Sequence, residues 1–332
     1  FNPRSSQNIA VYFGQSPATT RTSLADQCAD PNIDIVILGF LTSLRYNNTA
    51  GAFPRLELSA ACPSLQTEVM QTLAPGLAYY PQLEADILRC QGRYGKKILL
   101  SLGGAGSGEG LGIGSDEEAG GVADVLWGLF GPPGVVDEGL RPFGGAVVDG
   151  FDLDKSDGLP DHWDTVATAL RTKFATDTSK DYFLSAAPQC LFPDASIPLG
   201  WLVQSNFVWP QFFNNQKCDL TSPSLPDALS QWSRILASSI VPLSDASPFR
   251  TRLYVGVPSW PDAAPSSYAA AFGTGWRGVV SFARQIRLFL SEGGGGGTNL
   301  GGMMFWDGPE GGENVLGGLS ILGWAKRGLV SG

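Results

Sequence analysis

Three polar side chains at alternate positions are the strongest sign of chemistry in this chain. Asp152, Asp154 and Ser156 follow an apolar run that ends in a glycine, Val147-Val148-Asp149-Gly150. Side chains alternate along a strand, so these three share one face. Two carboxylates stacked in this way are costly to bury, and a solvated loop with scattered acids is the alternative interpretation. The apolar run before them favours a buried strand that presents a carboxyl pair to a site.

The elements that must position this pair recur along the chain. Short apolar runs, several of them continuous rather than alternating, are typical of parallel strands covered on both faces. Stretches with helical periodicity lie between them, at Leu83–Cys90, Val122–Phe130, Trp163–Phe174 and Val279–Leu290. Eight such strands predict an α/β fold, a (β/α)₈ TIM barrel, and a doubly wound open sheet is the alternative. The expected strands are Ile9–Phe13, Ile33–Leu41, Lys97–Leu102, Ala146–Leu153, Tyr182–Ala187, Phe207–Phe213, Leu253–Val257 and Leu300–Trp306.

We expect a single barrel domain over residues 1–332, because no stretch has the composition of a linker between domains. The glycine run at 293–297 precedes the last expected strand by only a few residues, so we interpret it as a loop. In a barrel of this kind, the face that carries Asp152, Asp154 and Ser156 would lie at the carboxyl-end mouth, where active sites are built.

Composition excludes several classes of protein. The chain has 332 residues, a net charge of −9 and no long apolar segment, so we expect neither a nucleic-acid partner nor a membrane span. A hydrophobic content of 43% with nine Trp excludes disorder. Five Cys and a first residue other than Met lead us to expect a secreted protein whose leader has been removed. We expect it to be a monomer.

The single histidine limits the available chemistry. With only His162, the chain has no Ser-His-Asp triad and no metal site built on histidines, and we expect His162 to be solvated. We expect no metal and no cofactor. The carboxyl pair therefore remains the main candidate for catalysis.

The segment around that pair resembles the strand-four motif D-G-x-D-x-D-x-E of family 18 glycoside hydrolases. The whole chain resembles the fungal and plant class III chitinases of that family. Further segments are similar to the family's first, third, fifth and eighth strands, namely Ile9–Gln15, Lys97–Gly104, Ser185–Cys190 and Gly302–Asp307. The resemblance implies a TIM barrel that binds chitin or N-acetylglucosamine oligosaccharides.

The first departure from the family pattern is Ser156, which stands where the family has its acid Glu. In the family, the N-acetyl carbonyl of the sugar attacks its own anomeric carbon while the Glu protonates the leaving oxygen. The middle carboxylate, here Asp154, orients the acetamido group. A serine hydroxyl is far too weak an acid for that proton transfer, and loss of a general acid typically costs about 10²–10⁴-fold in rate.

The second departure lies in Val208–Asn214, which is similar to the family's sixth-strand motif. The resemblance assigns Gln211 to substrate binding, together with the residue before the Asn. In the family that residue is a Tyr whose hydroxyl bonds the acetamido oxygen, and Phe213 stands there. A hydrogen bond worth roughly 0.5–1.5 kcal/mol is lost.

Other matched positions keep the sugar-binding character of the family. The resemblance makes Trp306 the floor of the sugar subsite and places Tyr12 and Phe40 on the wall. Aromatic faces suit the apolar faces of pyranose rings. Trp260 has no assigned role. The resemblance also pairs Cys28 with Cys90 and Cys190 with Cys218, which makes Cys62 the odd thiol.

Three hypotheses for function follow. The leading one is a secreted chitinase-like protein, a pseudoenzyme that binds N-acetylglucosamine oligomers with hydrolysis lost or strongly impaired. The second is an active endo-chitinase with an unusual acid, such as Asp157 or Glu109. The third is a protein-binding inhibitor on the same scaffold.

Overall fold

Eight parallel strands close into one barrel, which confirms the predicted fold class. The computed structural model describes residues 1–16, 22–48, 52–58, 62–105, 108–242, 248–291 and 299–331. The sheet runs β1-β11-β10-β7-β6-β5-β4-β2, and pairing of β1 with β2 closes it. The barrel strands are β1 (Asn8–Phe13), β2 (Ile35–Ser43), β4 (Lys97–Gly103), β5 (Gly150–Asp154), β6 (Phe183–Ala186), β7 (Phe207–Val208), β10 (Arg252–Pro258) and β11 (Leu300–Trp306).

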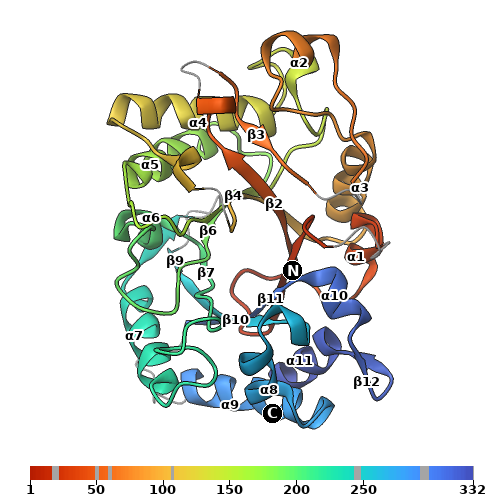
Figure 1. The fold of residues 1–332 in the computed structure, drawn as a ribbon, viewed down its shortest axis with the longest axis vertical. Helices are drawn as coiled ribbons and strands as arrows, with labels where there is room; N and C mark the ends of the chain where they lie inside the picture. Colours follow the sequence, from red (N-terminus) through yellow and green to blue (C-terminus); the bar gives the residue numbers. More distant parts are fainter. Residues whose placement is uncertain are drawn as a thin grey trace.

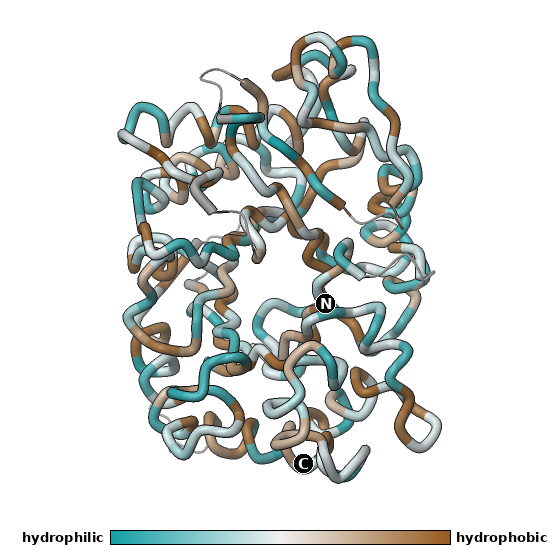
Figure 2. The backbone as a smooth tube through the Cα atoms, viewed as in Figure 1, coloured by the Kyte–Doolittle hydropathy of each residue, from teal (hydrophilic) through white to brown (hydrophobic). Residues whose placement is uncertain are grey.

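Helices surround the barrel and alternate with its strands along the chain (Figure 1). Along their length these helices alternate between hydrophilic and hydrophobic residues, as expected when one face packs on the sheet (Figure 2). The larger ones are α3 (Pro81–Gly92), α4 (Asp116–Phe130), α5 (Trp163–Phe174), α7 (Leu225–Ala237), α9 (Trp276–Ser291) and α11 (Ile321–Val330). Short elements on the outside and in the loops are α1 (Leu24–Ala29), α2 (Glu68–Leu73), α6 (Leu199–Gln204), α8 (Pro265–Phe272), α10 (Gly308–Glu313), β3 (Arg55–Leu56), β12 (Val315–Leu316) and β13 (Leu319–Ser320).

The strands separate two hydrophobic cores. The larger core lies between the barrel and the helices and takes the outward residues, such as Val11, Leu100 and Val255. The smaller core takes inward residues, including Tyr12 and Tyr254. Both strand faces are therefore buried, which explains why the strands appear in the sequence as continuous apolar runs.

The amino end of the barrel is closed by aromatic side chains. The ring of Phe1 lies edge-on to Phe183 and Phe207, with centroids 5.8 and 6.0 Å away. A hairpin of β8 (Ile240–Pro242) and β9 (Pro248–Arg250) adds Phe249 to the same core. Neither the role of Phe1 nor this hairpin was predicted from the sequence.

Two strands differ by several residues from their predicted bounds, and the others by at most two. β5 begins at Gly150 rather than Ala146, and β7 ends at Val208 rather than Phe213. Pro210 has no N–H for the ladder, which interrupts regular pairing. Pairing resumes beyond it, because Gln211 donates its N–H to the Pro188 carbonyl at 2.8 Å.

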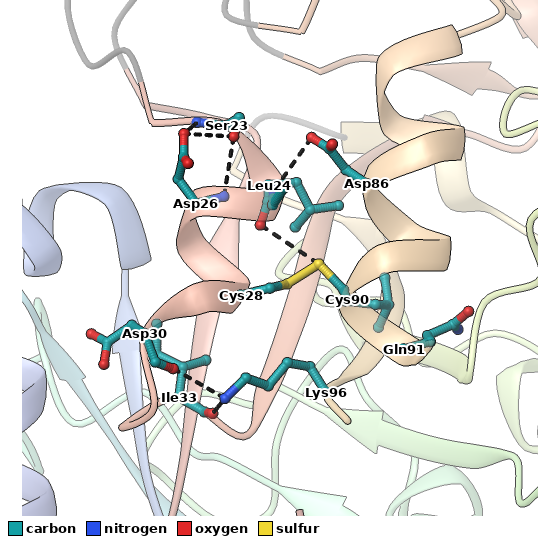
Figure 3. Close-up of a disulfide and its surroundings, with 12 residues drawn as sticks. Ser23, Leu24, Asp26, Cys28, Asp30, Ile33, Asp86, Cys90, Gln91 and Lys96 are labelled. Carbon is teal, nitrogen blue, oxygen red and sulfur yellow. Dashed lines mark hydrogen bonds between the residues drawn. A yellow bond between two sulfur atoms is a disulfide. The ribbon is translucent and has the colours of Figure 1, made fainter. Parts of the chain in front are cut away.

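Two disulfides join neighbouring elements, with the expected pairing. Cys28 of α1 is bonded to Cys90 of α3, and Cys190 to Cys218. Next to the first bridge, the Lys96 ammonium donates to the carbonyl oxygens of Asp30 and Ile33 at 3.0 and 2.5 Å (Figure 3). Cys62 is buried and belongs to neither bridge. Within the described ranges, no helix combines the length and the apolar character needed to cross a membrane.

Candidate active site

Asp152 lies inside the barrel as an acceptor for hydroxyl groups from three other strands. Tyr12 and Ser101 donate to its Oδ2 at 2.7 and 2.6 Å, and Ser185 donates to its Oδ1 at 2.7 Å. The strand register fixes this arrangement, because Ser101, Asp152 and Ser185 are paired across β4, β5 and β6. Burial raises the pKa of Asp152, while the three hydroxyl donors oppose that rise.

Asp154 occupies the next inward position and forms the last residue of β5. Gln211 Nε2 donates to its Oδ1 at 2.9 Å and also to the Ala187 carbonyl at 2.9 Å. Burial, followed by the charge of Asp152, raises the pKa of Asp154 to about 8. Asp154 is therefore mostly protonated at neutral pH, which agrees in direction with the expectation that two close carboxyls resist double ionisation.

Two glycines allow β5 to approach its neighbouring strands β4 and β6 closely. Gly150 has a φ of +145°, and a Cβ there would lie 1.8 Å from the Phe183 carbonyl oxygen of β6. Gly103 has a φ of +121°, and a Cβ there would lie 1.9 Å from the Asp154 carbonyl oxygen. Only glycine allows the backbones to approach this closely at both ends of the strand.

The two residues that follow β5 differ in burial. Ser156 is exposed, whereas Lys155 is 1% exposed. The Lys155 ammonium donates to the Asp157 carboxylate and the Leu159 carbonyl, and it lies 3.6 Å from the Asp161 carboxylate. Asp157 is therefore held in an ion pair with a buried lysine next to the strand. The side chain of Glu109, the other acid considered, lies outside the described residues.

Three aromatic rings from adjacent strands lie together beside the carboxyl pair. The Trp306 centroid is 5.2 Å from that of Tyr12 and 5.9 Å from that of Phe40, with the Phe40 ring nearly parallel. Tyr12 and Phe40 are almost fully buried, and Trp306 is half-buried. The peptide bonds Gly39–Phe40 and Trp306–Asp307 are cis. Trp306 is thus the member of this trio that a ligand can reach.

The two predicted binding residues that follow β7 differ in their contacts. Gln211 is bonded to Asp154, as described above. Phe213 is 7% exposed, and its phenyl ring has no hydroxyl with which to bind a polar ligand atom.

Several residues near the carboxyl pair were not predicted as site residues. Ser101 and Ser185 fall within segments similar to the family, but only the strand register reveals that both bond Asp152. Asp194 lies close enough to raise the pKa of Asp154, and its oxygens accept backbone N–H groups of Gln189, Ser196 and Ile197. Nothing in the sequence around Asp194 indicates this position.

Asp149 and His162 lie outside this cluster. Asp149, at the start of the motif, accepts from the Ile98 N–H at 2.8 Å and lies 3.2 Å from the Lys180 ammonium. The imidazole of His162 is exposed and lies 2.7 Å from Asp116, so it is paired as well as solvated. Among the residues with described positions, no group of three or more His, Cys, Asp or Glu side chains is arranged to hold a metal ion.

Sequence comparison identifies the family. The family model described as glycosyl hydrolases family 18 matches residues 8–248. A chitinase of Candida albicans, Chitinase 3, is 38% identical over 80% of this chain and 43% of its own length. An endochitinase of Saccharomyces cerevisiae is 35% identical over all of this chain and 52% of its own length. The chain thus spans about half the length of the curated relatives it matches.

Solved structures of plant proteins share the fold. A chitinase of Ipomoea carnea matches with a TM-score of 0.70 and 25% identity, over 97% of this chain and 99% of its own. A xylanase and α-amylase inhibitor protein of Scadoxus multiflorus matches with a TM-score of 0.67 and 27% identity, over 99% of this chain and all of its own.

Proposed function

The chain belongs to family 18 of the glycosyl hydrolases, and from that premise we propose that it binds N-acetylglucosamine oligomers with hydrolysis lost or strongly impaired. The observation that carries this proposal is the residue type two positions after Asp154, where the family motif has its acid Glu and this chain has the exposed Ser156. A hydroxyl has no proton to give at neutral pH, so the leaving oxygen of a glycosidic bond would depart unprotonated.

The surroundings of Asp157 weigh against it as a substitute acid. A general acid must reach the leaving oxygen within hydrogen-bond distance. The Asp157 carboxylate is instead bonded to the ammonium of Lys155, which is 1% exposed, whereas Ser156 is exposed. Removing Asp157 from that pair would leave a buried charge with one fewer partner, a costly change.

Binding needs fewer groups than hydrolysis, and those groups are present. We propose that a pyranose ring stacks on Trp306 while its acetamido group contacts Asp154. A protonated Asp154 carries one O–H donor, which suits the carbonyl oxygen of an acetamido group. The relatives named as chitinases support chitin-type oligosaccharides as the ligand class. The two disulfides support a secreted location, because such bonds persist in oxidising compartments.

The decisive experiment combines calorimetry with a hydrolysis assay on the same N-acetylglucosamine oligomers. We expect binding without turnover, weaker binding of glucose oligomers, and an affinity loss of about tenfold in Trp306→Ala. Trp276→Ala is the matched control, because Trp276 is 37% exposed on α9 and stacks on Trp324 instead. Hydrolysis by the wild-type protein at ordinary enzyme rates would contradict the proposal.

A second candidate function rests on the plant structures. The inhibitor of Scadoxus multiflorus has the same fold at 27% identity, so a protein-binding role on this scaffold is the alternative. Inhibition assays on a xylanase and an α-amylase distinguish it. Inhibition of either enzyme, combined with no affinity for N-acetylglucosamine oligomers, would favour this alternative.

A further inference from the structure

A hollow on the outside of the barrel has no part in the site described above. It lies between α8 and α9, two adjoining helices at the lower edge of Figure 1. Its volume is about 380 Å³, which is large enough for a small-molecule ligand. Its polar lining consists of Thr274, Arg277, Ser281 and Gln285.

The pattern of α9 leaves the face beside this hollow open to solvent. The apolar residues of the helix belong to the larger core against the barrel, namely Val279, Ala283, Ile286 and Leu290. On the opposite face, Arg277, Ser281, Arg284 and Gln285 are all exposed, and their spacing places them on one side of the helix.

Small residues keep the hollow open. A Cβ at Gly278 would lie only 2.5 Å from Thr274 Oγ1, so a larger residue there would push into the lining. Ala270 and Ala271 of α8 also line the hollow, and each contributes no more than a methyl group. The space is therefore a property of the residue types around it.

The segment that forms the hollow carries charges of one sign. Residues 263–291 include three Arg and no Asp or Glu, in a chain whose net charge is −9. Arg287 donates to the Ser331 carbonyl at 2.7 Å. Arg277 and Arg284, in contrast, form no ion pair with any carboxylate in the described part of the chain. A guanidinium without a carboxylate partner is available to an anion.

An aromatic stack holds Arg277 in place. Its guanidinium lies over the Trp276 indole, 5.0 Å from the ring centroid. Trp276 stacks on Trp324 of α11 with centroids 4.7 Å apart, and Trp324 Nε1 donates to the Leu316 carbonyl at 2.5 Å. Because the guanidinium is already restrained, it loses little freedom when it binds a ligand. Trp276 is 37% exposed, so it also offers an apolar surface next to this charge.

We infer that this hollow binds an acidic sugar, a pyranose that carries a carboxylate or a phosphate. The Arg277 guanidinium can hold either anion through two parallel hydrogen bonds. Ser281 and Gln285, which are joined at 3.4 Å, both donate and accept, as sugar hydroxyl groups do. The exposed part of Trp276 suits the apolar face of a pyranose. Neutral N-acetylglucosamine oligomers lack the anion, so the hollow takes no part in the binding proposed for the barrel mouth.

Calorimetry with acidic sugars and their neutral counterparts tests this site. We expect trigalacturonate and mannose 6-phosphate to bind with a Kd of about 1 mM, and galactotriose and mannose about tenfold more weakly or not at all. Arg277→Ala should weaken binding of both acidic probes about tenfold. Arg277→Lys keeps the charge without the paired hydrogen bonds and should give an intermediate loss.

Two further variants separate the hollow from net charge. Ser281→Phe fills the hollow, leaves Arg277 unchanged and should also weaken both acidic probes about tenfold, which keeps the test available if Arg277→Ala does not fold. Arg89→Ala is the matched control. Arg89 is exposed on α3, and its guanidinium lies 5.9 Å from the Tyr94 ring centroid, so the variant loses a similar cation elsewhere. Its affinity for both acidic probes should equal that of wild type.

Four results would contradict the acidic-sugar site. The first is no binding of either acidic probe, and the second is equal affinity for acidic and neutral sugars. The third is an equal loss in Arg277→Ala and Arg89→Ala, because net charge rather than the hollow would then attract the anion. The fourth is binding of inorganic phosphate, or of anionic phospholipid vesicles, as strong as that of mannose 6-phosphate, because the site would then recognise an anion without a sugar. All four leave the function proposed for the barrel mouth unchanged.

Discussion

The two ends of the barrel interior are built from the same strands and filled in opposite ways. At the amino end, Phe207 alone contacts five aromatic rings, those of Phe1, Phe183, Trp209, Phe249 and Tyr254. Toward the carboxyl end, the interior holds a carboxylate with three hydroxyl donors and then a second carboxyl. Apolar burial stabilises the fold, whereas buried carboxyls cost stability unless they are bonded. The aromatic amino end therefore stabilises the barrel, and this stability offsets the cost of burying carboxyl groups at the carboxyl end.

Removing the central ring of the amino end should give the largest effect on stability. Phe207→Ala deletes contacts with five rings in a closed core, so the free energy of unfolding should fall by about 3–5 kcal/mol. Chemical denaturation measures this loss. The exposed Leu88 is a suitable control, since Leu88→Ala should change stability by less than about 0.5 kcal/mol. Equal losses in the two variants would mean that the aromatic closure contributes no special stability.

Rebuilding the acid tests the carboxyl end. Ser156→Glu should give weak hydrolysis of N-acetylglucosamine oligomers, and the double variant with Phe213→Tyr up to about tenfold more, because acid and hydroxyl serve one transition state. Phe213→Tyr alone should add nothing, since no acid is present for it to assist. Steady-state rates on the oligomers measure these effects. A double variant that folds and binds but stays inert would show that the site is remodelled beyond these two positions.

The stability of the protein should depend on pH through the carboxyl end of the barrel, where Asp154 lies. The pKa of Asp154 in the folded state, about 8, is above its usual value of 3.8. Its contribution to stability is therefore present in full below pH 4 and is lost as pH rises to about 8. Asp154→Asn should remove this dependence, because the amide carries no charge at any pH. Above pH 8 its free energy of unfolding should exceed that of wild type by on the order of 2 kcal/mol. The difference is this small because solvent in contact with Asp154 screens part of the charge. Urea unfolding from pH 4 to 9 tests this, and parallel curves for the two proteins would contradict it.

The smallest expected effect is the loss of one hydroxyl at the carboxyl end. Ser185→Ala removes the donor to Asp152 Oδ1 and should lower the free energy of unfolding by about 1 kcal/mol near pH 7. Thermal unfolding of the two proteins gives the difference. Ser238→Ala, which removes an exposed hydroxyl bonded within its own helix end, is the control and should be close to neutral.

The sequence could predict the carboxyl end better than the amino end. Continuous apolar runs located all eight strands, and alternation placed Asp152 and Asp154 on one inward face. The aromatic side chains that close the amino end were not predicted. Phe1 and Phe249 lie in segments without periodicity, and their burial depends only on the tertiary fold. The same limit applies to Asp194, which reaches the neighbourhood of Asp154 through a loop. Pro210 explains the shortened β7, and that effect is visible in the sequence once the ladder is considered.

The barrel pairs its first strand in the sequence with its last, since Asn8 pairs with Gly302 across β1 and β11. Bringing such distant segments together costs more chain entropy than any local pairing, so we expect this seam to limit the rate of folding. Neither disulfide crosses it, because the bridges span 62 and 28 residues within the interior of the chain. A fully oxidised chain can therefore still have an open sheet. Correct cysteine pairing alone is thus no measure of refolded protein, whereas protection from hydrogen exchange of the amides that bond across the β1–β11 pair is.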